Sequence, residues 1–82
     1  MPISFKKNVA VLRGTCSIED SERLLSALVK APDRTVDLSD LKNVHTAVVQ
    51  VLMACRPHCI AAPKDEELSD VLAPVLNFEP AS

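Results

Sequence analysis

The stretch TVDLSDLKNVHTAVVQVLMAC, residues 35–55, decides how the chain folds. Its first residues, TVDL, combine β-branched and apolar side chains and predict a short core strand over residues 35–38. The polar residues that follow predict a loop over residues 39–44. This loop leads into the most apolar segment of the chain.

A helix that is apolar on nearly all sides is predicted over residues 47–55. Gln50 is the only polar residue in this run. Because such a helix has to be buried, the sequence indicates that it forms the centre of the core. His45 and Thr46 stand at its polar start, and we expect the functional surface of the protein there.

An amphipathic helix is predicted before this stretch, over residues 18–30. Ser17 and Asp20 have the spacing of a capping box at its start. Its expected core face carries Ile18, Leu24, Leu25 and Leu28 at helical spacing. An apolar run over residues 9–12 predicts a buried strand of the kind found in parallel sheets, ended by Gly14.

The remaining segments predict two further strands and a last helix. Alternating apolar and polar side chains over residues 3–6 fit a short edge strand. Small residues over 59–62 predict another strand, and the last helix is expected to start at Pro63. Pro74 lies inside that helix and predicts a stop or a kink near residues 71–73. The apolar residues of this helix are Leu68, Val71, Leu72, Val75 and Leu76.

The predicted order of elements is (β)βαβαβα within one domain, residues 1–82. Strands that alternate with helices favour a parallel sheet with right-handed crossovers. We therefore expect an α/β fold with a small, mostly parallel sheet of three or four strands. Its three helices should lie mainly on one face.

Composition argues against several classes of partner. The formal net charge is −2 and aromatic residues make up 2% of the chain, so neither a basic surface nor stacking platforms for nucleic acid are expected. No apolar run approaches the roughly 20 residues that cross a bilayer, and no secretory signal pattern is present. We expect a cytoplasmic protein with reduced cysteines, without membrane insertion and without a cofactor.

The motif V-D-L-S at residues 36–39, a spacer, and V-H-T-A-V-V-Q-V-L at residues 44–52 together resemble a STAS domain. This is the fold of the anti-anti-sigma factors. Members of the family typically have D-L-S, a spacer, and D-S-S-G-L before a buried helix. The resemblance covers roughly residues 8–76.

Aligned without gaps, the family aspartate falls on His45, the first serine on Thr46, the second serine on Ala47 and the glycine on Val48. The resemblance implies a small cytoplasmic switch that binds an anti-sigma kinase or a similar partner without catalysis. Phosphorylation of the second serine releases the partner in the family, and Ala47 cannot be phosphorylated. Other relatives are accessory subunits of transporters or of lipid-trafficking complexes, and the sequence does not choose between these partners.

The candidate partner-binding residues are Ser39, Asp40, Lys42, His45 and Thr46. Thr46 is also the candidate phosphorylation site, because a helix start accommodates a phosphate group. The alternative is that Thr46 or His45 only caps the helix. A positive charge is disfavoured at a helix start, so we expect His45 to be neutral and hydrogen-bonded, with a partner contact as the alternative.

The segment Cys55 to Cys59, which includes His58, raises a second class of function, a small redox or metal protein. A zinc site needs about four ligands, and only Cys16 and His45 remain to complete one. The sequence shows no base that would activate a cysteine. We therefore expect no metal site and no catalytic residue.

Self-association is a further alternative. Phe5, Phe78 and the edge strand over residues 3–6 are available to join a second copy in a homodimer.

Overall fold

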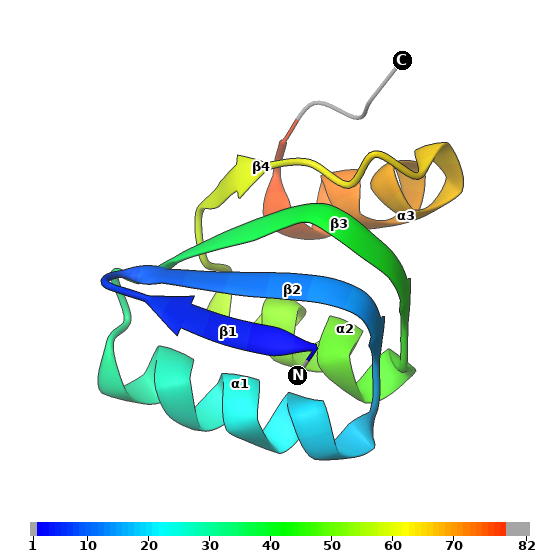
Figure 1. Ribbon diagram of the computed structural model, residues 1–82. Helices are drawn as coiled ribbons and strands as arrows, with labels where there is room; N and C mark the ends of the chain where they lie inside the picture. The colour runs from blue at the N-terminus through cyan, green and yellow to red at the C-terminus, as the bar shows by residue number, and fades with distance from the viewer. Residues whose placement is uncertain (1, 79–82) are drawn as a thin grey trace.

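The fold is shown in Figure 1 as a computed structural model that describes residues 2–78. Its elements are β1 (Ile3–Lys6), β2 (Val9–Cys16), α1 (Ile18–Lys30), β3 (Thr35–Val44), α2 (Thr46–Cys55), β4 (Cys59–Ala61) and α3 (Glu66–Leu76). The strands form one sheet in the order β1-β2-β3-β4. β1 is antiparallel to β2, whereas β2, β3 and β4 are parallel. The predicted fold class is confirmed; the predicted domain limits, residues 1 and 82, lie outside the described residues.

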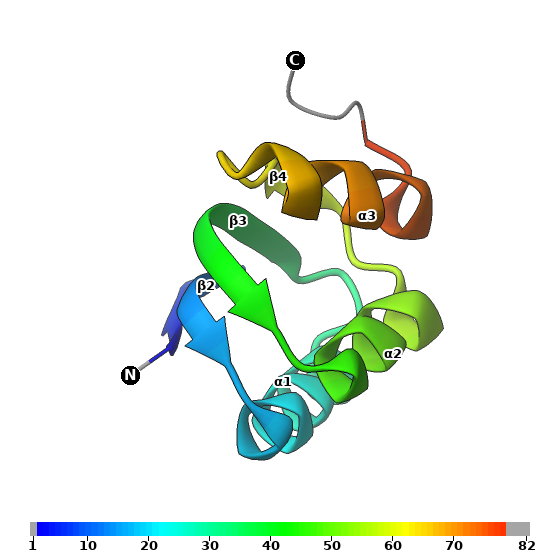
Figure 2. The ribbon, with the colours of Figure 1, turned by 90° about the vertical axis from the view of Figure 1, so that its right-hand side faces the viewer.

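The three helices pack on one shared core. α1 and α2 lie side by side under one face of the sheet, and α3 lies along the β3–β4 edge (Figures 1 and 2). The buried side chains of strands and helices form a single cluster, which comprises Ile3, Ala10, Leu12, Cys16, Leu24, Leu28, Val36, Leu38, Leu41, Val48, Leu52, Leu72 and Leu76. Full burial of one large apolar side chain contributes about 1.5–3 kcal/mol, so this cluster is the main source of stability.

The start of α1 agrees closely with the prediction. The carboxylate of Asp20 accepts hydrogen bonds from the backbone N–H of Ser17, at 2.8 Å, and from its hydroxyl, at 3.1 Å. Asp20 is buried, so these bonds satisfy a charge that has little access to water. Two residues expected in the core, Ile18 and Leu25, are exposed instead, while Ser21 is buried.

The prediction that the second helix is buried all round is wrong. In α2 only Val48 and Leu52 are fully buried, whereas Met53 is 53% exposed. The sheet covers one side of α2, and α1 and α3 lie along two other sides (Figures 1 and 2). Its outer side therefore faces solvent.

The predicted loop over residues 39–44 is also wrong, because β3 continues to Val44. Arg13 of β2 pairs with Asp40, and Gly14 pairs with Leu41. The register shifts twice along this pair, so β3 holds extra residues as bulges. The first bulge brings Leu41 back to the core although it follows Leu38 by three positions, a spacing that is not typical of a strand.

β2 is likewise longer than predicted and runs past Gly14 to Cys16. Gly14 has φ +58°, in the left-handed region, and lies at the second register shift. A glycine adopts this conformation without the steric cost that a side chain would bring, so the strand bends here and does not end.

The C-terminal part differs from the prediction in several details. β4 ends at Ala61, and α3 starts at Glu66, with the carboxylate of Asp65 accepting the N–H of Leu68 at 3.0 Å. Pro74 does not stop α3, which continues to Leu76. Proline has no N–H to donate to the carbonyl four residues earlier, but the chain still closes its last turn, where the N–H groups of Asn77 and Phe78 donate to the carbonyl of Ala73.

Two apolar residues near the end of the described chain also lie where they were not expected. Val71 is exposed, although it was expected to face the core. Phe78 is half-buried and packs against the core, so it is not the free surface group that the homodimer alternative assumed.

Candidate partner-binding surface

The surface predicted from the sequence lies where β3 passes into α2, and we call residues 42–46 the β3–α2 corner. The backbone N–H of His45 donates to the carbonyl of Cys16 at 2.9 Å, which fixes the corner to the end of β2. His45 Nδ1 accepts the N–H of Ala47 at 3.0 Å. The side chains of His45 and Thr46 are both exposed.

These bonds decide between the two alternative helix caps. His45 has extended backbone angles, φ −71° and ψ 148°, and is the N-cap, whereas Thr46 is the first residue of α2. A nitrogen that accepts a hydrogen bond carries no proton, so the cap uses the tautomer with its proton on Nε2. Of the two caps that the sequence left open, His45 is therefore the one observed, and the hydroxyl of Thr46 does not cap the helix.

A hollow lies on each side of the last residues of β3. The hollow toward β2 has a volume of about 340 Å³ and is lined by Thr15, Cys16, Ser17, Asn43, Val44 and His45. The hollow toward α3 has a volume of about 310 Å³ and is lined by Lys42, Asn43, Asp65, Glu67, Leu68 and Val71. Asn43 lines both, so the corner forms a ridge between two depressions.

Two exposed apolar side chains flank this ridge. Ile18, at the start of α1, is 53% exposed and follows Ser17, which lines the first hollow. Val71, in α3, is 59% exposed and lines the second. Sequence periodicity assigned both to the core, so no signal in the sequence identified them as surface residues. Exposed apolar groups beside polar ones are typical of the cores and rims of protein interfaces.

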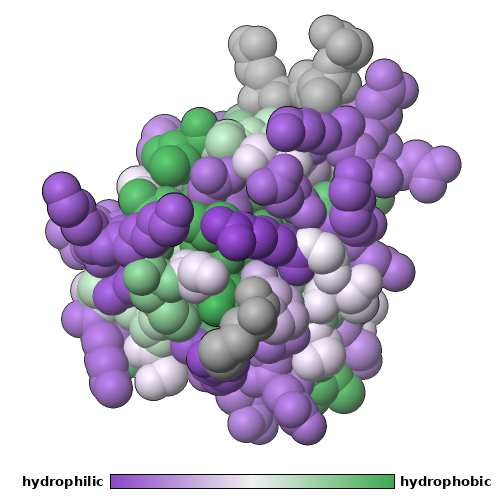
Figure 3. All heavy atoms as spheres, in the orientation of Figure 1, coloured by the Kyte–Doolittle hydropathy of each residue, from purple (hydrophilic) through white to green (hydrophobic). Residues whose placement is uncertain are grey.

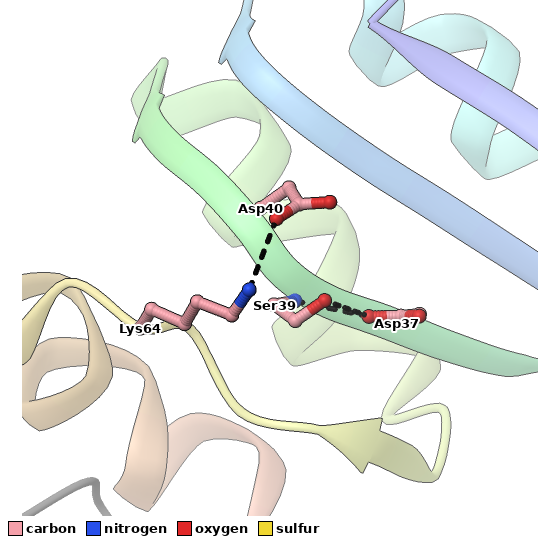
Figure 4. A network of polar contacts seen from close by, with 4 residues as sticks. All are labelled: Asp37, Ser39, Asp40 and Lys64. Atoms are coloured by element: carbon pink, nitrogen blue, oxygen red, sulfur yellow. Dashed lines mark hydrogen bonds and ion pairs between the residues drawn. The ribbon is translucent and has the colours of Figure 1, made fainter.

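Ser39 and Asp40 lie apart from the corner, in the first bulge of β3. The N–H and the hydroxyl of Ser39 donate to one carboxylate oxygen of Asp37, at 3.0 and 2.8 Å (Figure 4). Asp40 forms an ion pair with Lys64 at 3.6 Å, and both side chains are exposed. The N–H of Lys64 also donates to the carbonyl of Ser39 at 3.3 Å, which ties this bulge to the segment before α3.

The five predicted contact residues therefore follow one another along β3 and the start of α2. Ser39 and His45 are six positions apart in a strand that advances about 3.3 Å per residue, whereas Asp40 and Lys42 are only two positions apart. Ser39 and Asp40 contact the segment before α3, Lys42 lines the hollow toward α3, and His45 lines the hollow toward β2. On the face seen in Figure 3, hydrophobic areas are small and interrupted by hydrophilic side chains.

The cysteines are free thiols. Burial raises the pKa of Cys16 to about 11, with the nearby Asp20 carboxylate adding to the effect. Burial also raises the pKa of Cys59, whose thiol donates to the carbonyl of Ala61 at 3.3 Å. Both groups are thus protonated at neutral pH, which is the opposite of an activated thiolate.

Neither a cluster of metal ligands nor a membrane-spanning helix is found in residues 2–78. Within this part of the chain, no group of three or more His, Cys, Asp and Glu side chains is placed to hold a metal ion. Among the helices described, none has both the length and the apolar character needed to cross a bilayer.

No model of a known protein family matches the sequence, and no curated protein matches it either.

Proposed function

We propose that this chain is a non-catalytic protein-binding module of the STAS type. In this proposal it binds a regulatory protein, of the anti-sigma kinase kind, through the β3–α2 corner. The resemblance of residues 36–39 and 44–52 to the family motif supports the class. A mostly parallel sheet with its helices on one core is compatible with it.

The observation that carries the proposal is the exposure of the side chains of His45 and Thr46 at the β3–α2 corner, where His45 also lines the hollow toward β2. The backbone of the corner is fixed by hydrogen bonds to Cys16 and within α2, so a partner would meet a rigid surface. Preorganised surfaces lose little entropy on binding. Ile18 and Val71 supply apolar contacts at the two sides.

Thr46 is the proposed point of control. Its hydroxyl does not cap the helix, because His45 does. Ala47, which aligns with the regulatory serine of the family, has no hydroxyl and cannot be phosphorylated. A phosphate on Thr46 would be favourable for the helix, because negative charge is stabilised at a helix N-terminus. It would also place nearly two charges in the middle of the contact and so release the partner.

The same surface serves the alternative function, in which the chain is an accessory subunit of a transporter or of a lipid-trafficking complex. The identity of the bound protein separates the two.

The third alternative, a redox or metal protein that uses Cys55, His58 and Cys59, is less well supported. The raised pKa of Cys59 opposes thiolate formation. Metal analysis of the purified protein tests this reading, and stoichiometric zinc would favour it.

The experiment that tests the proposal uses a photocrosslinking amino acid at position 46 and, as a matched control, at position 29. Val29 is also an exposed β-branched helical residue. It lies near the C-terminal end of α1, whereas the β3–α2 corner is close to the residues that start α1. We expect position 46 to capture one protein in cells of the source organism and position 29 to capture none.

The affinity of the purified pair is then measured for Thr46→Arg and Val29→Arg. We expect Thr46→Arg to weaken binding at least tenfold, as for a central contact residue, and Val29→Arg to leave it unchanged. Circular dichroism checks that both variants fold. Capture at neither position, or equal affinities for the two variants, contradicts the proposal.

A further inference from the structure

A further hollow lies at the opposite ends of the strands from the β3–α2 corner. It has a volume of about 570 Å³ and lies between one side of α1 and the ring of Phe5 in β1. This volume is within the range of sites that bind small molecules. Figure 1 shows at its left side that α1 ends close to the turn from β1 to β2.

Three of the seven residues that line this hollow are cationic. Arg23 and Lys30 of α1 and Arg34 of the following loop contribute three positive charges, and Glu22 contributes one negative charge. The local formal charge is therefore +2, in a chain whose net charge is −2. Lys30 and Arg34 lie near the C-terminal end of α1, so the attraction for an anion comes from side chains and not from the helix backbone.

Arg34 is held in a defined position in this hollow. Its guanidinium lies over the Phe5 ring, with 5.2 Å between the guanidinium carbon and the ring centre. Its Nε is buried and has no hydrogen-bond partner among residues 2–78. A buried donor without an acceptor is costly, and the planar guanidinium suits the oxygens of a phosphate or carboxylate.

The geometry points to a binding site for a small phosphate-bearing ligand in this hollow. A phosphate monoester carries nearly two negative charges at neutral pH, which suits the positive charges of Lys30 and Arg34 that line the hollow. Arg34 and Lys30 bind the phosphate oxygens, and the hydroxyl of Ser26, which also lines the hollow, is a further donor. The Phe5 ring and the Ala27 methyl group contact the apolar part of the ligand.

The site is tested by titrating ¹⁵N-labelled protein with inorganic phosphate and with glycerol 3-phosphate, at constant ionic strength with chloride as the reference. We expect saturable shifts of the Arg34 Nε–H signal and of the Ala27 and Lys30 amides. Vesicles of phosphatidylglycerol, compared with vesicles of phosphatidylcholine, decide whether a lipid headgroup is also a source of the phosphate.

Three variants make the result specific. Arg34→Lys keeps the charge but loses the planar donors, and Lys30→Gln removes one charge. Each should weaken binding about tenfold. Lys64→Gln removes an exposed charge elsewhere and should change nothing.

Absence of saturable shifts with every probe overturns the site. Equal affinities for all three variants overturn it as well, whether the probe is a soluble phosphate or a vesicle. Because this hollow shares no residue with the β3–α2 corner, failure here leaves the proposed function untouched.

Discussion

The imidazole of His45 accepts the backbone N–H of Ala47 at 3.0 Å, so the N-cap of α2 is a histidine and not the adjacent threonine. At the candidate surface, the residue that stabilises the helix therefore differs from the residue proposed for control of binding. His45 caps α2, whereas Thr46 does not. Substitutions at the two positions should therefore have different consequences.

We expect His45→Ala to lower the free energy of unfolding by about 1 kcal/mol, because one N–H of the first turn loses its acceptor. His45→Asn should keep most of the stability, since asparagine is a good N-cap. Thr46→Ala should change it by less than about 0.5 kcal/mol. Urea unfolding followed by circular dichroism measures all three. A loss at Thr46 as large as the loss at His45 would show that the threonine shares the capping role.

The start of α1 gives a second prediction. Asp20 accepts two hydrogen bonds from Ser17, one from the backbone and one from the hydroxyl. Ser17→Ala removes only the hydroxyl bond, whereas Asp20→Ala removes both and leaves the Ser17 N–H without this acceptor. We expect a loss of about 1 kcal/mol for Ser17→Ala and about 2 kcal/mol for Asp20→Ala. The reverse order of the two losses would contradict the capping geometry.

The burial of Cys16 predicts how stability depends on alkaline pH. Its pKa rises from the ordinary 9.0 to about 11 in the folded protein. Between these values the unfolded thiol loses its proton while the folded thiol keeps it, so the unfolded state is favoured as pH rises. The contribution is fully present below pH 9 and lost above pH 11, a total of about 2–3 kcal/mol at about 1.4 kcal/mol per unit.

Urea unfolding between pH 8 and pH 11.5 measures this effect, with Cys16→Ala as the reference. The variant shares every lysine titration with the parent chain but lacks the thiol. We expect the free energy of unfolding of the parent chain to fall by about 2–3 kcal/mol more than that of Cys16→Ala between pH 9 and pH 11. Parallel curves would show that the folded thiol ionises normally.

The partial burial of α2 predicts a contrast between two neighbouring residues. Leu52 is fully buried, so Leu52→Ala should cost about 2–5 kcal/mol through lost burial and a remaining cavity. Met53 is 53% exposed, and Met53→Ala should cost less than about 1 kcal/mol. Chemical denaturation compares them directly. Similar losses would mean that the helix is buried on both sides, as its composition alone suggests.

Local features were predictable from sequence where one segment contains all the groups involved. The limits of α1, the contact of Ser17 with Asp20, and the placement of a helix start at residues 45–46 follow from spacing and capping chemistry. The α/β class and the mostly parallel sheet follow from the alternation of strand and helix patterns. These interactions span only a few positions, so the order of residues carries the information.

Other features depend on which element lies next to which. The second half of β3 was hidden because its bulges break the two-residue alternation, and only pairing with β2 reveals it. Ile18 and Val71 have helical spacing typical of a core face, but periodicity does not say whether a neighbour covers that face. The cation cluster beside Phe5 joins residues from β1, α1 and the loop before β3. Sequence by itself determined the order of the elements and the cap of α1, and the tertiary structure alone decided exposure, strand ends and the gathering of distant charges, because these depend on contacts between segments far apart in the chain.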